Sequence, residues 1–276
     1  MTNLVTADEV RTICGIGSDQ ISDSDVDEII TDVQSQLEKY LGTKLTATKT
    51  IDILDGEAIV EDRIFLNNTP VLSLRAVKTD TTDIDIDDIE IYSESGMLRL
   101  KNTATSSTFI AEPYKTKVKY VFGWLDRDYS TQTTTTSASG TGSSVQVYVD
   151  DVSNFTVGDW VWIYGMDGNQ EAAEVSGTGA NYITVDELGY EHESGSYVVK
   201  LVTPDYLKRL LKILVALAMV ARVVGQSYDD IVGYSLGDMS VQKGEPYTQW
   251  RETAMELIKE RDEILKRIKP RIVVRI

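Results

Sequence analysis

Apolar residues near the start of the chain recur every three to four positions, which is the spacing of α-helices. Thr6 and Glu9 have the spacing of a capping box, so we expect a short helix that ends near Gly15. A longer helix is expected from a cap at Ser24 to a stop at Gly42. One stripe of this second helix carries the apolar residues Val26, Ile29, Ile30, Val33, Leu37, Tyr40 and Leu41.

Between Lys49 and Trp124 the pattern changes to the short apolar runs that are typical of β-strands. Residues 83–87 alternate aspartate with isoleucine, so we expect a strand there with its isoleucines on one face. Turn sequences at Asn67–Pro70 and at Ser95-Gly96 separate neighbouring runs. This part of the chain is therefore predicted to form a small antiparallel sheet.

A second β region follows a change in composition. Residues 130–144 contain eleven serines or threonines and two glycines, which is typical of a flexible linker. Five short apolar runs then lie between residues 145 and 201, with turn sequences between them. We expect residues 145–201 to form an inserted domain, a small all-β barrel or sandwich.

Helical spacing returns at Thr203-Pro204, where a cap precedes a proline at the first helical position. Residues 206–224 are apolar on nearly every face and predict a central helix, and Pro246 begins a final helix that Pro270 ends. We expect an α+β fold, in which residues 1–129 and 202–276 form a helical bundle of about four helices around a small antiparallel β element.

Charge and residue counts exclude several classes of function. The net charge of −17 argues against a protein that wraps nucleic acid. The single cysteine, Cys14, excludes a disulfide framework, and the single histidine, His192, excludes multi-histidine metal motifs. We expect Cys14, at the apolar end of a short helix, to be packed rather than reactive, and His192 to lie in a solvated surface loop between Glu191 and Glu193. No metal ion or cofactor is expected.

One sequence has the form of a catalytic motif. Residues 233–237 match the G-x-S-x-G nucleophile elbow around Ser235, but no helical pattern follows, and the histidine precedes the serine. Aspartates at 83, 85, 87 and 88 lack the invariant glycine and the closing glutamate of a calcium-binding loop, and the sequence Asp167-Gly168-Asn169 is equally incomplete. We therefore expect a protein that is not an enzyme, with an esterase built on Ser235 as one alternative.

The chain lacks the signals of export and of membrane insertion. Its N-terminal residues have neither the basic region nor the apolar run of a signal peptide. The most apolar stretch, residues 213–221, is too short to span a bilayer. We expect a protein of a cytosol-like compartment without a membrane partner.

The C-terminal end differs in charge from the rest of the chain. Residues 201–276 contain thirteen Lys/Arg and ten Asp/Glu, a net charge of +3, so residues 1–200 carry −20. Basic residues favour a helix C-terminus, but this does not explain an extended apolar segment after Pro270. We expect a docking segment that binds a partner. It comprises Lys266, Arg267, Lys269, Arg271, Ile272, Val273, Val274, Arg275 and Ile276.

Six short motifs follow one another along the chain: Val5–Val10, Tyr40–Gly42, Leu66–Leu74, Ser95–Leu100, Lys119–Trp124 and Thr203–Lys208. Their order resembles that of the gp6-like head–tail connector (adaptor) family of tailed viruses. The resemblance covers roughly residues 1–129 and 202–276. In this family the Gly-Trp motif leads almost directly into the Pro-x-x-Leu-Lys helix, so residues 130–201 have the position of an insertion.

The resemblance implies a structural virion protein of the neck. Such a protein forms a ring, commonly of twelve copies, which docks on the portal protein through its C-terminal segment and meets a downstream neck or tail-completion protein. Double-stranded DNA passes through the ring without specific binding, and an acidic lining would repel its phosphates. The expected location is the portal vertex of the virion, and the host cytoplasm during assembly.

A binding module is the alternative from another class. In it the inserted domain would recognise a glycan or a protein through Trp160, Trp162 and Tyr164, which share one face of a predicted strand. The core of a small barrel explains these aromatic residues equally well.

Overall fold

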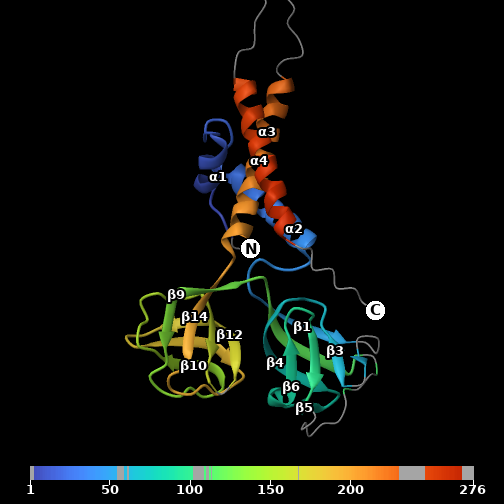
Figure 1. Cartoon of the computed structure of the whole chain (residues 1–276), viewed down its shortest axis with the longest axis vertical. Helices are drawn as coiled ribbons and strands as arrows, with labels where there is room; N and C mark the ends of the chain where they lie inside the picture. Colours follow the sequence, from blue (N-terminus) through green and yellow to red (C-terminus); the bar gives the residue numbers. More distant parts are fainter. Residues whose placement is uncertain are drawn as a thin grey trace, which may run out of the picture. The chain divides into compact units, whose positions relative to one another are not determined.

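A computed structural model of the protein describes residues 3–54, 59–60, 62–101, 109, 112, 114–166, 168–229 and 246–268. The chain forms two compact units. The helical unit consists of Met1–Leu41 and Asp205–Ile276, and the β unit consists of Gly42–Pro204. All four described α-helices belong to the first unit, and all fourteen described strands belong to the second (Figure 1).

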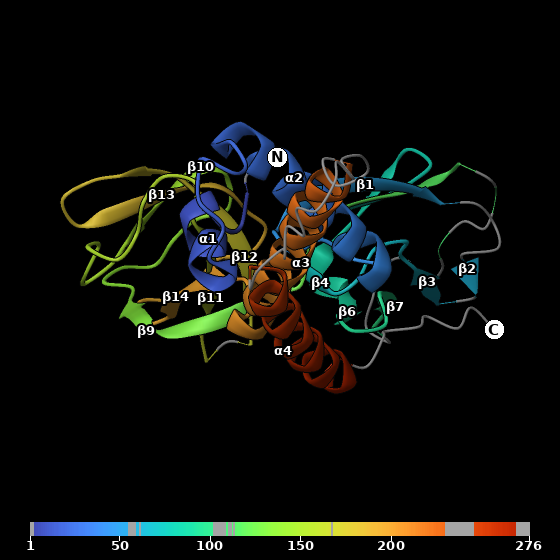
Figure 2. The ribbon, with the colours of Figure 1, turned by 90° about the horizontal axis from the view of Figure 1, so that it is seen from above.

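The helical unit is arranged around one helix. Its elements are α1 (Ala7–Cys14), α2 (Asp23–Leu41), α3 (Asp205–Asp229) and α4 (Pro246–Arg267). Helices α1, α2 and α4 each contact α3, which Figure 2 shows between them. Leu211 and Ile213 are two positions apart and so lie on opposite faces of α3, and the burial of both confirms the prediction of a central helix. None of the helices in the described ranges is long and apolar enough to cross a membrane.

Capping residues close in sequence determine where the first two helices begin and where α1 ends. The predicted capping box is present, since Thr6 accepts from the backbone of Glu9 while the Glu9 carboxylate accepts from the backbone of Thr6. Gly15 ends α1 in the left-handed conformation, with φ of 67°. Helix α2 begins earlier than predicted, because its first turn is capped by the Ser22 hydroxyl, which accepts from Asp25 N at 3.3 Å.

Cys14 lies at the buried end of α1, with 4% of its surface exposed, which confirms that it is packed. Burial raises the pKa of its thiol, and the thiolate is the reactive form. We expect a disulfide reagent at pH 7 to label Cys14 in the folded protein about 100-fold more slowly than in urea. Equal labelling rates in the two conditions would contradict a packed Cys14.

The β unit contains three antiparallel sheets, with strand orders β1-β8-β4-β5, β2-β3-β7-β6 and β10-β13-β12-β11-β14-β9. The first two are built from β1 (Thr48–Leu54), β2 (Ile59–Val60), β3 (Arg63–Phe65), β4 (Val71–Thr79), β5 (Thr82–Ile84), β6 (Ile89–Tyr92), β7 (Met97–Leu100) and β8 (Thr116–Phe122). The third is built from β9 (Asp126–Thr134), β10 (Gly142–Tyr148), β11 (Trp160–Tyr164), β12 (Gln170–Thr178), β13 (Tyr182–Leu188) and β14 (Tyr197–Val202).

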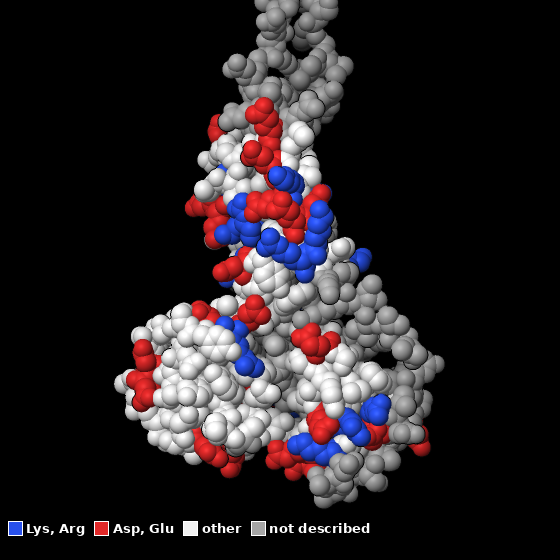
Figure 3. Space-filling model, in the orientation of Figure 1, with Lys and Arg blue, Asp and Glu red and all other residues white. Residues whose placement is uncertain are grey.

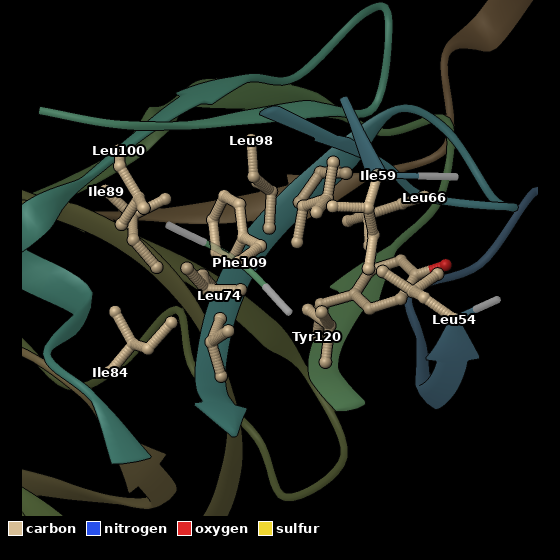
Figure 4. Close-up of a cluster of buried hydrophobic side chains, with 14 of the residues drawn as sticks. Leu54, Ile59, Leu66, Leu74, Ile84, Ile89, Leu98, Leu100, Phe109 and Tyr120 are labelled. Atoms are coloured by element: carbon tan, nitrogen blue, oxygen red, sulfur yellow. The ribbon is translucent and has the colours of Figure 1, made fainter. Parts of the chain in front are cut away.

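The first two sheets share one hydrophobic core, part of which Figure 4 shows, including Leu74, Leu98 and Tyr120. The strand predicted over residues 83–87 is shorter than expected. Strand β5 ends at Ile84, and a 3-10 turn follows at Ile86–Asp88, capped by the Asp85 carboxylate. Ile84 is buried in the core as the alternation predicted.

The third sheet closes into a barrel. Its edge strands β9 and β10 meet where Thr135 bridges Val149, and Thr136 N donates to Tyr148 O at 2.9 Å. The barrel interior is filled by apolar side chains that include Val161, Ile163 and Val185. Residues 130–144, for which we predicted a flexible linker, contribute to β9 and β10. Threonine is a strand former, so this composition is compatible with strands once partner strands are present.

The predicted fold class is therefore wrong. Strands outnumber helices among the described residues, and they form a unit with its own cores rather than a small element inside a helical bundle. The physical reason is that the apolar stripes of α1, α2 and α4 are covered by α3, so the helices need no sheet to bury them.

Candidate functional site

A buried ion pair joins strand β4 of the first sheet to strand β12 of the barrel. The Arg75 guanidinium donates to Glu171 Oε2 at 2.6 Å and to the carbonyl oxygen of Ala172. The side chains of Arg75 and Glu171 are only 2% and 0% exposed. A charge this deep needs compensation for its lost hydration, and each partner supplies it to the other.

Glu171 is the centre of a larger hydrogen-bonded cluster. Its carboxylate also accepts from Gly189 N and Tyr190 N, each at 2.9 Å, and lies 3.2 Å from His192 Nε2. Both carboxylate oxygens are therefore occupied by donors from separate segments. The cluster holds the first sheet, the barrel wall and the segment before β14 together.

His192 belongs to this cluster, so the prediction of a solvated surface loop is wrong. The residue is 1% exposed, and Ser139 N donates to its carbonyl oxygen at 2.9 Å. The bridge between Ser139 and His192 holds the segment around His192 beside Glu171. The two glutamates on either side of His192 did not indicate this burial.

The Glu171–His192 pair has the composition of part of a catalytic triad, but its environment favours a structural role. His192 Nδ1 has no hydrogen-bond partner among the described residues, so no serine hydroxyl there is bonded to it. Both side chains are 0% exposed, which leaves a substrate no route to them.

Two lysines extend the contact between the first sheet and the barrel. Lys49 of β1 lies 2.6 Å from Glu174 and 3.0 Å from Asp186, and Lys119 of β8 lies 2.7 Å from Glu187. A basic sheet surface thus faces an acidic side of the barrel. These outer pairs are partly exposed, so removing one partner is expected to cost less stability there than at the buried pair.

Strand β11 turns its large aromatic side chains away from the barrel core. Val161 and Ile163 fill the interior, while Trp160, Trp162 and Tyr164 point outward. The core therefore does not explain these aromatic residues, although the sequence left that explanation open.

An arginine is stacked against this outward surface. Arg127 Cζ lies 4.7 Å from the ring centroid of Trp162 and 5.4 Å from that of Tyr164. The rings of Tyr164 and Tyr197 are 5.3 Å apart between centroids. We call the surface formed by Arg127, Tyr129, Trp160, Trp162, Tyr164 and Tyr197 the aromatic face.

A bulge in β9 completes the aromatic face. Asp128 pairs with Lys200, but the next pair along the strand is Thr133 with Val198, so residues 129–132 bulge out of the ladder. The Tyr164 hydroxyl donates to Gln132 Oε1 at 3.3 Å, which places the bulge beside β11. Burial raises the pKa of Tyr164, and the neighbouring Tyr129 adds to this shift.

The other predicted site residues are not brought together by the described structure. Lys266 and Arg267 are exposed in the last turn of α4, whereas Lys269, Arg271, Ile272, Val273, Val274, Arg275 and Ile276 lie outside the described residues. Ser235 and Asp167 also lie outside them. Within the described ranges, no group of three or more His, Cys, Asp or Glu side chains is placed to hold a metal ion.

Comparison with protein families and with curated proteins adds no relative. No family model and no curated protein matches this sequence.

Proposed function

We propose that the protein is a structural subunit of the neck of a tailed virus, a head–tail adaptor that forms a ring and docks on the portal protein. The observation that carries this proposal is the basic end of α4. Lys266 and Arg267 are exposed there, and the following sequence adds Lys269, Arg271 and Arg275 without any acidic residue. In a chain of net charge −17, this end is suited to an acidic or groove-bearing partner.

Helix α4 also carries apolar surface that its own unit leaves uncovered. Leu257 and Ile264 are buried, whereas Met255 is 62% exposed and Ile258 is 39% exposed. Exposed apolar side chains on a helix that already buries one stripe support a contact between subunits, as a ring requires. A downstream neck or tail-completion protein would bind the same ring on its other side.

The charge of the remaining chain supports the passage of DNA. Residues 1–200 carry a net charge of −20, and an acidic channel lining repels phosphates and prevents tight binding. The ring would thus contact double-stranded DNA without holding it.

Deleting residues 271–276 is expected to abolish binding to the portal while the melting temperature stays within about 2 °C of the full chain, because the fold would not depend on this tail. The measurement is a pull-down of tagged protein from a virus-producing lysate, with bound proteins quantified by mass spectrometry. A second variant with Ile272, Val273, Val274 and Ile276 changed to serine keeps the charges and separates apolar from electrostatic docking. Portal captured equally by the truncated and full chains would overturn the role of the tail, and no portal captured by the full chain would overturn the adaptor.

The aromatic face favours a second candidate function, a non-catalytic binding module carried by the barrel. Aromatic residues that the barrel core does not use are placed on its outer surface together with an arginine. Trp, Tyr and Arg dominate the energetically important positions of binding surfaces. This function is compatible with an adaptor that presents the barrel to a further ligand.

A further inference from the structure

Arg127 differs from the other arginines of the β unit in its partners. Arg63, Arg75 and Arg99 each have a carboxylate oxygen within 3.4 Å. The backbone of Arg127 is paired with Leu201 in the ladder between β9 and β14, but its guanidinium forms neither a hydrogen bond nor an ion pair with any described residue. The side-chain contacts are the rings of Trp162 and Tyr164. The chain has 44 acidic residues, yet none of those that the structure describes pairs with this guanidinium.

Stacking on aromatic rings occupies the faces of a guanidinium and leaves its edge available. The five N–H donors of arginine lie at that edge, in a fork that matches the two oxygens of a carboxylate. The rings also restrict the side chain before a ligand arrives, which lowers the entropy cost of binding. Arg127 is therefore a preorganised site for a carboxylate.

The surroundings of Arg127 select what carries that carboxylate. Tyr129 is 60% exposed and Tyr197 is 39% exposed, so two phenol groups with both an apolar ring and a hydroxyl are open to solvent. The β9 bulge adds Ser130, Thr131 and Gln132, which are uncharged, and most of the barrel surface in view in Figure 3 is neither acidic nor basic. Flat aromatic rings beside neutral hydroxyl and amide groups complement the C–H face and the hydroxyl groups of a sugar ring.

We propose that the aromatic face binds an acidic saccharide, with the sugar carboxylate on Arg127 and a pyranose ring against Tyr129 or Tyr197. This inference rests on the second candidate function and is independent of the adaptor proposal. The surface lies along the outer faces of β9, β11 and β14, so it is suited to a stretch of an acidic polysaccharide chain.

The test uses the full-length protein and trigalacturonate, titrated by calorimetry. Methyl esterification of the trisaccharide removes its negative charges and is expected to weaken binding at least about tenfold. Arg127→Gln is expected to cause a similar loss, Arg127→Lys a smaller one, and Tyr129→Ala about a threefold loss. Tyr148→Ala is the matched control, because Tyr148 is an exposed tyrosine of the same barrel that stacks on Tyr182 instead. Its affinity should equal that of the unchanged protein.

Hexaglutamate peptide is the second probe, and it separates the sugar from a protein carboxylate. If hexaglutamate binds through Arg127 and trigalacturonate does not bind, the proposal of a saccharide ligand is overturned, whereas the proposal of a binding module is retained. Equal binding of the esterified trisaccharide would overturn the carboxylate site at Arg127. If neither probe binds to protein that melts cooperatively by circular dichroism, both the saccharide site and the binding module are overturned.

Discussion

Replacing Glu171 with glutamine is expected to lower the free energy of unfolding of the β unit by about 3–5 kcal/mol. The substitution removes the negative charge beside Arg75, whose side chain is 2% exposed and cannot recover its hydration. It also replaces one of the two carboxylate oxygens with an amide N–H₂ group, so that either Gly189 N, which donates to Oε2, or Tyr190 N, which donates to Oε1, faces a donor instead of an acceptor. Urea unfolding followed by tryptophan fluorescence measures the loss, since Trp124, Trp160 and Trp162 lie in the β unit.

Glu187→Gln is the control for this prediction. Glu187 also pairs with a cation of the first sheet, Lys119, but their side chains are 30% and 42% exposed. A solvated pair of this kind contributes less than about 1 kcal/mol. If Glu171→Gln and Glu187→Gln lower the free energy of unfolding equally, the buried pair is no more important for stability than the exposed pair, and the prediction is wrong. A double variant, Arg75→Met with Glu171→Leu, should recover much of the stability, because no uncompensated charge remains.

Local periodicity predicted the elements whose partners are close in sequence. The capping box at Thr6 and the apolar stripe of α2 are encoded within a few turns, and both are present. The strands β11 and β13 were also predicted, because turn sequences bound a short apolar run on each side. In each case the physical signal is contained in fewer than about twenty residues.

Features that depend on distant partners were not predictable in this way. Arg75 and Glu171 are separated by 96 positions, and the packing of the first sheet against the barrel brings them together. A signal existed at Arg75, which interrupts the apolar run of residues 71–77, because a buried charge in such a run needs a partner. Glu171 directly follows a polar turn sequence and carries no such signal. The Ser/Thr composition of residues 130–144 misled for the same reason, because pairing with β13 and β14 decides that it forms strands.

Strand β1 shows that an apolar run can predict a strand without showing which face of the strand is buried. Its isoleucines at 51 and 53 are 61% and 53% exposed, whereas Asp52 between them is 6% exposed. The Asp52 carboxylate accepts from Asn67 N at 2.7 Å and from the Tyr120 hydroxyl at 2.8 Å. Tyr120 in turn accepts from Asn68 N at 3.2 Å, so the buried aspartate fixes the turn that precedes β4.

Asp52→Ala is therefore expected to lower the free energy of unfolding of the β unit by about 2–4 kcal/mol, because Asn67 N and the Tyr120 hydroxyl lose their acceptor inside the protein. Asp52→Asn keeps one acceptor oxygen and should cost less. Ile51→Thr, on the exposed face of the same strand, should change stability by no more than about 0.5 kcal/mol. Urea unfolding of the three variants compares the two faces directly. A larger loss for Ile51→Thr than for Asp52→Ala would mean that the isoleucines are the buried face, and that the strand is paired one residue out of register.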